Sequence, residues 1–96
     1  MPLERDLSAI LTRLDLPPAS REILLERFAQ TLDLAQAGEG TIGLENLCDN
    51  LYDFDVPLSQ DVRDQLARLC WEYNVDDERI GILDMLTKRQ NRTSDA

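Results

Sequence analysis

Seven acidic side chains and no lysine or arginine lie in the stretch from Phe28 to Val62, which therefore carries −7 of the −9 formal charge. Carboxylates at this density could transfer protons, ligate a hard cation or bind the cations of a partner protein. A patch of one sign cannot neutralise itself, so it raises the local potential and attracts a basic partner. The pattern favours a protein-binding surface over a reaction.

The acids in the middle of this stretch follow a helical spacing. Apolar residues recur at positions 44, 47, 48, 51 and 54, which predicts an amphipathic helix. At about 100° per residue, Glu45, Asp49 and Asp53 are expected along its flank and back, with Tyr52 beside them. A solvated helix face is the plain alternative. Against it, the segment lacks the Lys or Arg at i, i+4 that a merely soluble helix usually carries.

Proton-transfer chemistry has little support in the sequence. The chain contains no histidine, which removes the commonest general base and metal ligand and makes a Ser–His or Cys–His pair impossible. Two cysteines without histidine do not make a zinc site. Gly38, Gly40 and Gly43 are not followed by the Gly-Lys-Ser/Thr of a phosphate loop. Acid pairs such as Asp53 and Asp55 are the only candidates for general acid–base catalysis. We expect no catalytic residue, no cofactor and no metal, hence no enzyme.

The acidic segment does not have the residue spacing of a calcium-binding loop. A calcium loop needs acids at positions 1, 3 and 5 and a glycine at position 6. A loop starting at Asp53 has Asp55 at position 3, but proline and leucine stand at positions 5 and 6.

Acyl carrier proteins are also small, acidic and helical, and their prosthetic group is carried by a serine in an Asp-Ser-Leu motif. In this chain Ser8 lies in Leu-Ser-Ala, Ser20 in Ala-Ser-Arg and Ser59 in Leu-Ser-Gln, so no serine matches.

The only tryptophan, Trp71, is expected on a helix starting near Ser59. The apolar residues of that helix gather on one side, and Trp71 projects about 180° away from them, in line with Asp64. Two alternatives stay open: the last helix folds over Trp71, or Trp71 is an exposed aromatic anchor beside acids, as in interface hot spots. The candidate partner-binding residues are Glu45, Asp49, Tyr52, Asp53, Asp55, Asp64, Trp71 and Glu72.

Length and charge limit the possible functions further. With 96 residues the chain has room for one domain. A net charge of −9 disfavours contact with DNA, RNA or anionic membranes, which are polyanions. We find no signal-peptide pattern and no apolar run long enough to span a bilayer. These features predict a cytoplasmic protein in which Cys48 and Cys70 are reduced and packed, with a disulfide between them as the alternative.

The elements that must position these residues are all helical, because no segment shows sustained strand alternation. Short links imply antiparallel neighbours, so we expect an all-α fold: a single compact bundle of four to five short antiparallel helices. The first helix carries leucines up to Leu14 and ends at the turn 16–18. Ser20 is expected to cap the second helix, which ends at Gly38 and Gly40. Its expected buried residues are Ile23, Leu24, Leu25, Phe28, Leu32 and Ala35.

The second half of the chain is predicted in the same way. A glycine-rich link, 39–43, leads into the acidic helix with Thr41 as its cap, and Ser59 caps the next helix after Pro57. A turn at 74–77 starts the final helix, which ends near Arg89. The helical domain is therefore expected to span 1–89, followed by a polar, flexible tail at 90–96.

The segment from Leu44 to Ser59 resembles a stretch found in short bacterial immunity proteins. It combines an apolar helix with Leu-Cys, an acidic and aromatic end, an apolar-Pro-apolar turn and a helix started by serine. The resemblance is to the MafI-like immunity families of polymorphic or contact-dependent toxin systems. It implies a small cytoplasmic protein that binds and blocks a cognate toxin domain. An acidic inhibitor would suit a nuclease toxin, whose groove must be basic.

Other classes are compatible with the same residues. A small acidic adaptor or secretion chaperone would also bind a basic protein partner, as a monomer or a dimer when free. A carrier or enzyme domain is the third class. The partner expected from the resemblance is a toxin protein with a basic surface, with no nucleic acid and no membrane involved.

Overall fold

The chain forms five α-helices in a computed structural model that describes residues 2–95, with side chains from 3 to 88. The helices are α1 (Pro2–Leu11), α2 (Arg21–Gln36), α3 (Gly40–Asp53), α4 (Gln60–Glu72) and α5 (Asp77–Asp95), and a 3₁₀ turn at Pro18–Ser20 precedes α2. No strand occurs in the described part of the chain. The predicted all-α class and the predicted number of helices are confirmed.

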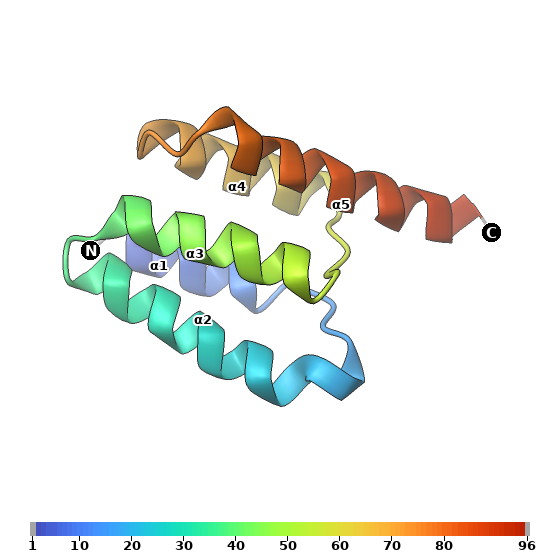
Figure 1. Cartoon of the computed structure of the whole chain (residues 1–96), viewed down its shortest axis with the longest axis horizontal. Coiled ribbons are helices and arrows are strands. Elements are labelled where there is room, and N and C mark those ends of the chain that lie inside the picture. The colour runs from blue at the N-terminus through green and yellow to red at the C-terminus, as the bar shows by residue number, and fades with distance from the viewer. Residues whose placement is uncertain (1, 96) are drawn as a thin grey trace.

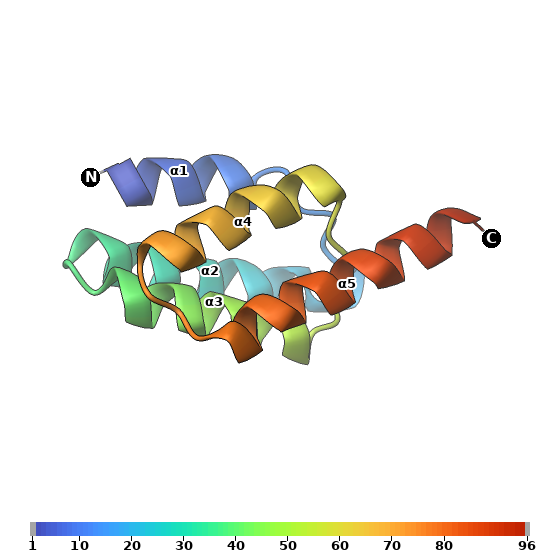
Figure 2. The same ribbon diagram turned by 90° about the horizontal axis from the view of Figure 1, so that it is seen from above.

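Helix α3 lies in the middle of the bundle. It packs against α2 on one side and against α5 and α4 on the other, while α1 contacts α2 and α4 (Figures 1 and 2). The antiparallel pairs α2–α3 and α4–α5 thus form two layers, and the C-terminal end of α5 projects beyond them. The core between the layers is aliphatic, and its fully buried leucines include Leu7, Leu24, Leu44, Leu47, Leu51, Leu66, Leu83 and Leu86.

The start of α3 differs from the predicted glycine-rich link. Gly40 is the first residue of the helix, and Gly43 lies within its first turns. A Cβ on Gly43 would lie 3.2 Å from the carbonyl oxygen of Thr31 and 3.3 Å from Cβ of Leu34, so the glycine permits close packing of α3 on α2. Only Gly38, with φ +83°, acts as a helix stop. Thr41 does not cap α3, because its hydroxyl donates a hydrogen bond to the carbonyl of Tyr73 (2.6 Å).

The first two helices also differ in detail from the prediction. Helix α1 ends at Leu11, three residues earlier than expected, and Leu14 is half-buried in the link that follows. Ser20 precedes α2 without a side-chain capping bond. Ile23 and Leu25 were expected on the buried side but are exposed at 39% and 48%, because the side facing the core runs through positions 24, 28, 31 and 35.

Side chains cap the first turns of both α4 and α5. Ser59 caps α4 as predicted, since its hydroxyl accepts a hydrogen bond from the backbone N–H of Val62 (3.3 Å). Asp76 caps α5, since its carboxylate accepts from the backbone N–H of Arg79 (3.2 Å). Helix α5 continues to Asp95 instead of ending near Arg89, because neither glycine nor proline follows Gly81 to stop it. The side chains of the predicted flexible tail lie outside the described residues.

Candidate protein-binding surface

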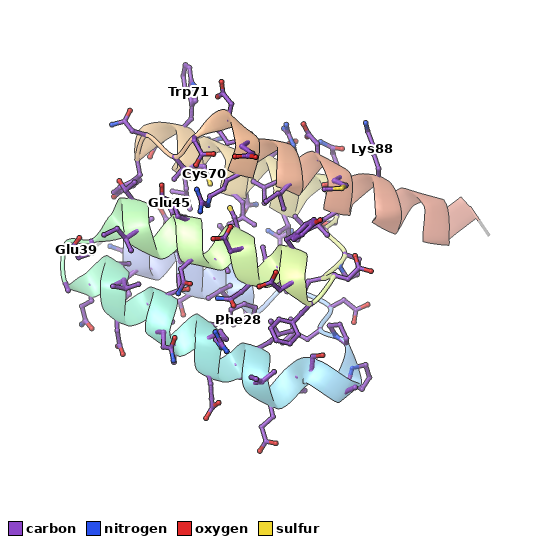
Figure 3. The ribbon with its side chains drawn as sticks, viewed as in Figure 1. Phe28, Glu39, Glu45, Cys70, Trp71 and Lys88 are labelled. Carbon is purple, nitrogen blue, oxygen red and sulfur yellow. The ribbon has the colours of Figure 1, made fainter. Side chains whose placement is uncertain are left out.

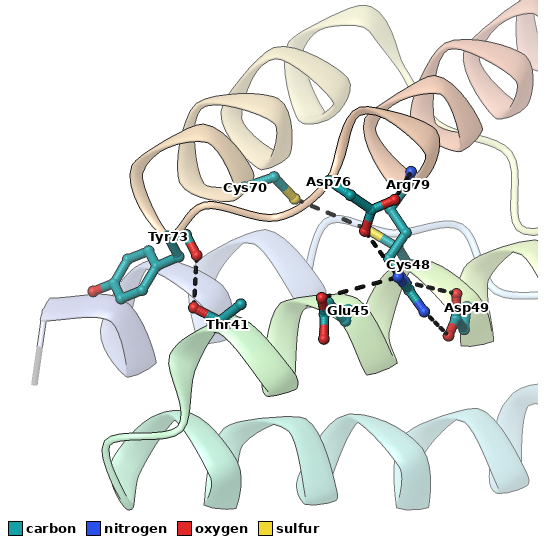
Figure 4. A network of polar contacts seen from close by, with 8 residues as sticks. All are labelled: Thr41, Glu45, Cys48, Asp49, Cys70, Tyr73, Asp76 and Arg79. Carbon is teal, nitrogen blue, oxygen red and sulfur yellow. Dashed lines mark hydrogen bonds and ion pairs between the residues drawn. The ribbon is translucent and has the colours of Figure 1, made fainter.

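A single arginine from α5 joins the acids of α3. The Arg79 guanidinium donates two hydrogen bonds to the Asp49 carboxylate, from Nε and from one terminal nitrogen, both at 3.1 Å (Figure 4). Its other terminal nitrogen lies 2.8 Å from Asp76 and 3.9 Å from Glu45. This bidentate pairing with Asp49 is the strong form of an arginine–carboxylate contact. We call these four residues the Arg79 cluster.

The Arg79 cluster corrects the sequence-based view of the acidic helix. Glu45 and Asp49 were expected to present uncompensated charge to solvent, yet both are only partly exposed and both lie against Arg79. Compensation is incomplete, however, because three carboxylates share one guanidinium and leave a net charge of −2. The two α3 acids therefore link α3 to α5 at the rim of the core, and the cluster keeps a residual negative charge.

The pKa values of the cluster reflect these contacts. Hydrogen bonds from the Arg79 guanidinium lower the pKa of the Asp76 carboxyl below its ordinary value. Hydrogen bonds to Asp49 and then to Asp76 raise the pKa of Arg79, which stays protonated at any relevant pH. Both shifts favour the charged forms of Asp76 and Arg79, the ion pair that anchors the first turn of α5.

Sequence reasoning missed the role of Arg79, although one signal was present. Arg79 lies in the first turn of α5, where the positive end of the helix dipole disfavours a cation. It is also the only cation between Arg68 and Lys88. A cation placed against the dipole suggests that acids from another element hold it there.

Trp71 is the most exposed large apolar side chain among the described residues, at 78%. It points away from the bundle at the end of α4 (Figure 3). The alternative in which the last helix covers Trp71 is wrong, because this exposure leaves its ring in solvent, whereas the buried residues of α4 are Val62, Leu66, Leu69 and Cys70. Trp71 lines a shallow hollow together with Asn74, Val75 and Asp77.

Three acids without an ion pair among the described side chains lie near Trp71 in the chain: Asp77 shares its hollow, Glu72 follows Trp71 in the sequence, and Glu78 follows Asp77. Glu72, Asp77 and Glu78 are exposed, and none of them makes an ion pair with a described side chain. Arg68 lies one turn before Glu72, and both line a hollow between α1 and α4, so Asp77 and Glu78 are the less compensated acids. We call Trp71, Glu72, Asp77 and Glu78 the acidic corner. Sequence analysis predicted the first two. It missed Asp77, which it assigned only to the turn that starts the final helix, and it made no assignment for Glu78.

The remaining predicted residues divide between two places. Tyr52, exposed at 47%, and Asp53 lie at the end of α3, and Tyr52 lines a hollow between α3 and α5. Asp55 follows in the link, in the left-handed region with φ 54°.

Asp64 lies on α4 and pairs with its neighbour Arg63 (3.1 Å), which also binds Asp84 of α5 (2.7 Å). Hydrogen bonds to Asp84 and then to Asp64 raise the pKa of Arg63. Asp64 is thus separate from the α3 acids.

The two cysteines form a buried contact between α3 and α4. Their Sγ atoms lie 3.9 Å apart. Both residues are free, buried thiols, as predicted from the sequence. The hydrogen-bond contact with Cys70 and burial raise the pKa of the Cys48 thiol, which makes it unreactive in the folded protein.

Comparison with protein-family models, with curated proteins and with solved structures found no significant match. Within residues 2–95, no helix has both the length and the apolar character that crossing a membrane requires.

Proposed function

We propose that the protein binds a cation-rich protein partner through the acidic corner and the adjoining ends of α3 and α5. Within that class, we propose an immunity protein that binds a cognate bacterial toxin domain and blocks it by occlusion. The observation that carries the proposal is Trp71, exposed at 78% beside Asp77.

An exposed tryptophan is unusual on a surface that has no partner. Trp buries a large apolar area and is strongly enriched among interface hot spots, where a few side chains supply most of the binding energy. Trp71 points away from the bundle, so none of the described side chains covers its ring. Covering it with a partner would remove this apolar area from water.

The surrounding acids support a cationic partner. Asp77 and Glu78 add to the residual charge of the Arg79 cluster, so this end of the molecule is strongly negative. Such a field speeds association with a positive surface and disfavours partners of the wrong sign. A toxin with a basic groove for a polyanionic substrate would offer the matching charge.

The proposal is tested with a candidate toxin domain taken from the product of an adjacent gene. The purified chain should bind that toxin domain in equal amounts and inhibit it, and Trp71→Ala should weaken binding about tenfold or more. Leu25→Ala is the matched control, because Leu25 is also exposed but lies on α2, away from this surface. Failure of the toxin domain to bind, or equal effects of the two substitutions, would count against the proposal. Binding only to a product of a secretion or regulatory operon would indicate an adaptor instead.

A further inference from the structure

A groove of about 520 Å³ lies between α3 and α5, next to the acidic corner. Its apolar side chains are Tyr52 from α3 and Ile82 and Met85 from α5. Tyr52 and Met85 are exposed at 47% and 38%, so they present apolar surface that nothing in the described chain covers. The carboxylates of Asp49 and Glu78 line the same groove, and so does the Arg79 guanidinium, which is paired with Asp49.

Gly81 lines this groove from the second turn of α5. A Cβ added at Gly81 would meet no heavy atom within 4 Å, and its φ does not require glycine. The residue is therefore not needed for close packing or for a special backbone conformation, although glycine is less stable than alanine inside a helix. What its missing side chain does provide is open space in the groove.

The charge around the groove is negative. Asp49 belongs to the Arg79 cluster, whose net charge is −2, and Glu78 adds a further carboxylate that pairs with no cation among the side chains of residues 3–88. Apolar side chains flanked by a surplus of carboxylates are complementary to a segment with the opposite charge and a similar apolar anchor.

We infer that the groove is the docking place for a basic, amphipathic segment of the partner protein. One apolar side chain of that segment would lie over Gly81, between Tyr52 and Met85, and a neighbouring Lys or Arg would lie against Glu78. The inference rests on the proposed function for the existence of a protein partner and adds the kind of segment that the partner presents.

A peptide titration tests the groove without the toxin. The probe is a short helical peptide of leucine and lysine. Its binding is monitored by NMR through the backbone amide shifts of the isotope-labelled chain. We expect shifts concentrated at residues 49–53 and 78–85, and none of comparable size with a leucine–glutamate peptide of the same apolar pattern.

Two substitutions at one position sharpen this test. Gly81→Leu fills the groove where there is room for the new side chain, so the fold should persist while peptide affinity falls about tenfold. Gly81→Ala makes the same gain in helix propensity with far less filling, and it should bind almost like the parent. Circular dichroism checks that both variants stay folded.

Three results would overturn the inference. The first is the absence of peptide-induced shifts. The second is a set of shifts spread over exposed acids elsewhere, such as Glu22 and Glu26 on α2, or shifts that persist unchanged in Gly81→Leu. The third is that the groove residues shift with protein concentration alone, which would make a second copy of the chain the occupant.

The toxin domain separates failure of the groove from failure of the proposed function. If it binds the parent and Gly81→Leu equally well, the groove is wrong and the proposed function stands. If the peptide fills the groove but no neighbouring toxin binds the chain, the proposed function is wrong and the groove stands.

Discussion

Helix α3 is held on its two sides by different kinds of contact. Against α2, the helices approach so closely that a single added methyl group on Gly43 would press on the Thr31 carbonyl oxygen. Against α5, the rim of the contact is ionic, with Arg79 bridging to Asp49 and Glu45. The first contact depends on shape and tolerates little change, whereas the second depends on charge and leaves a groove at the surface. The difference indicates where the molecule can bind a partner without losing its fold.

Breaking the apolar packing of α3 should have the largest effect. Leu44 is fully buried, and Leu44→Ala would remove buried methyl groups and leave a cavity. We expect a loss of about 2–5 kcal/mol in the free energy of unfolding, measured by chemical denaturation. A loss well below this range would mean that the helices rearrange to fill the space.

The same substitution at two glycines should have opposite effects. Gly43→Ala would force α3 away from the backbone of α2 and should cost about 1–2 kcal/mol. Gly81→Ala meets no neighbour and should stabilise α5 by about 0.5–1 kcal/mol. Parallel denaturation curves measure both, and effects of the same sign would contradict the contrast between the two contacts.

Removing the ionic bridge should have a smaller effect. Arg79→Met keeps an aliphatic stem of similar length but loses the contacts with Asp49 and Glu45. Because these side chains are partly exposed, we expect a cost of about 0.5–1 kcal/mol at low ionic strength, shrinking as salt is added. Denaturation at two salt concentrations checks this, and a cost that is independent of salt would point to lost packing instead.

The pH dependence of stability that comes from Asp76, a partner of Arg79, should be the smallest of these effects. The folded-state pKa of Asp76 is depressed by Arg79, so its contribution to stability is present above the ordinary pKa of 3.8 and is lost as the pH falls through the folded-state pKa. In Arg79→Met the pKa of Asp76 should rise toward 3.8, as followed by carboxyl NMR shifts. An unchanged pKa would show that capping of α5 alone depresses it.

The fold was predictable where local patterns decide it, and less so where distant segments meet. The helical periodicity of residues 44–54, the cap at Ser59 and the turn before α5 all follow from neighbouring residues. The glycines at the start of α3 do not, because their roles depend on how closely α2 and α3 approach. The same holds for buried Thr31, whose hydroxyl has no hydrogen-bond partner among the described residues.

The candidate surface was predicted only in part. Trp71 was identified as facing away from the apolar side of its helix, and it is exposed. The sequence could not show that Arg79 reaches Asp49 across 30 positions, since ion pairs between helices depend on the tertiary arrangement. Reversing Asp49 to lysine would therefore disturb the fold, and Asp77 and Glu78 are the better positions for testing charge.

The salt dependence of association with the candidate toxin domain tests the central claim most directly. Stopped-flow rates are compared for the parent, for Asp77→Lys combined with Glu78→Lys, and for Glu26→Lys combined with Asp33→Lys, which changes the net charge equally on α2. We predict that only the first pair slows association strongly at low salt and flattens its salt dependence. Equal slowing by both pairs, or by neither, would contradict a binding surface at the acidic corner.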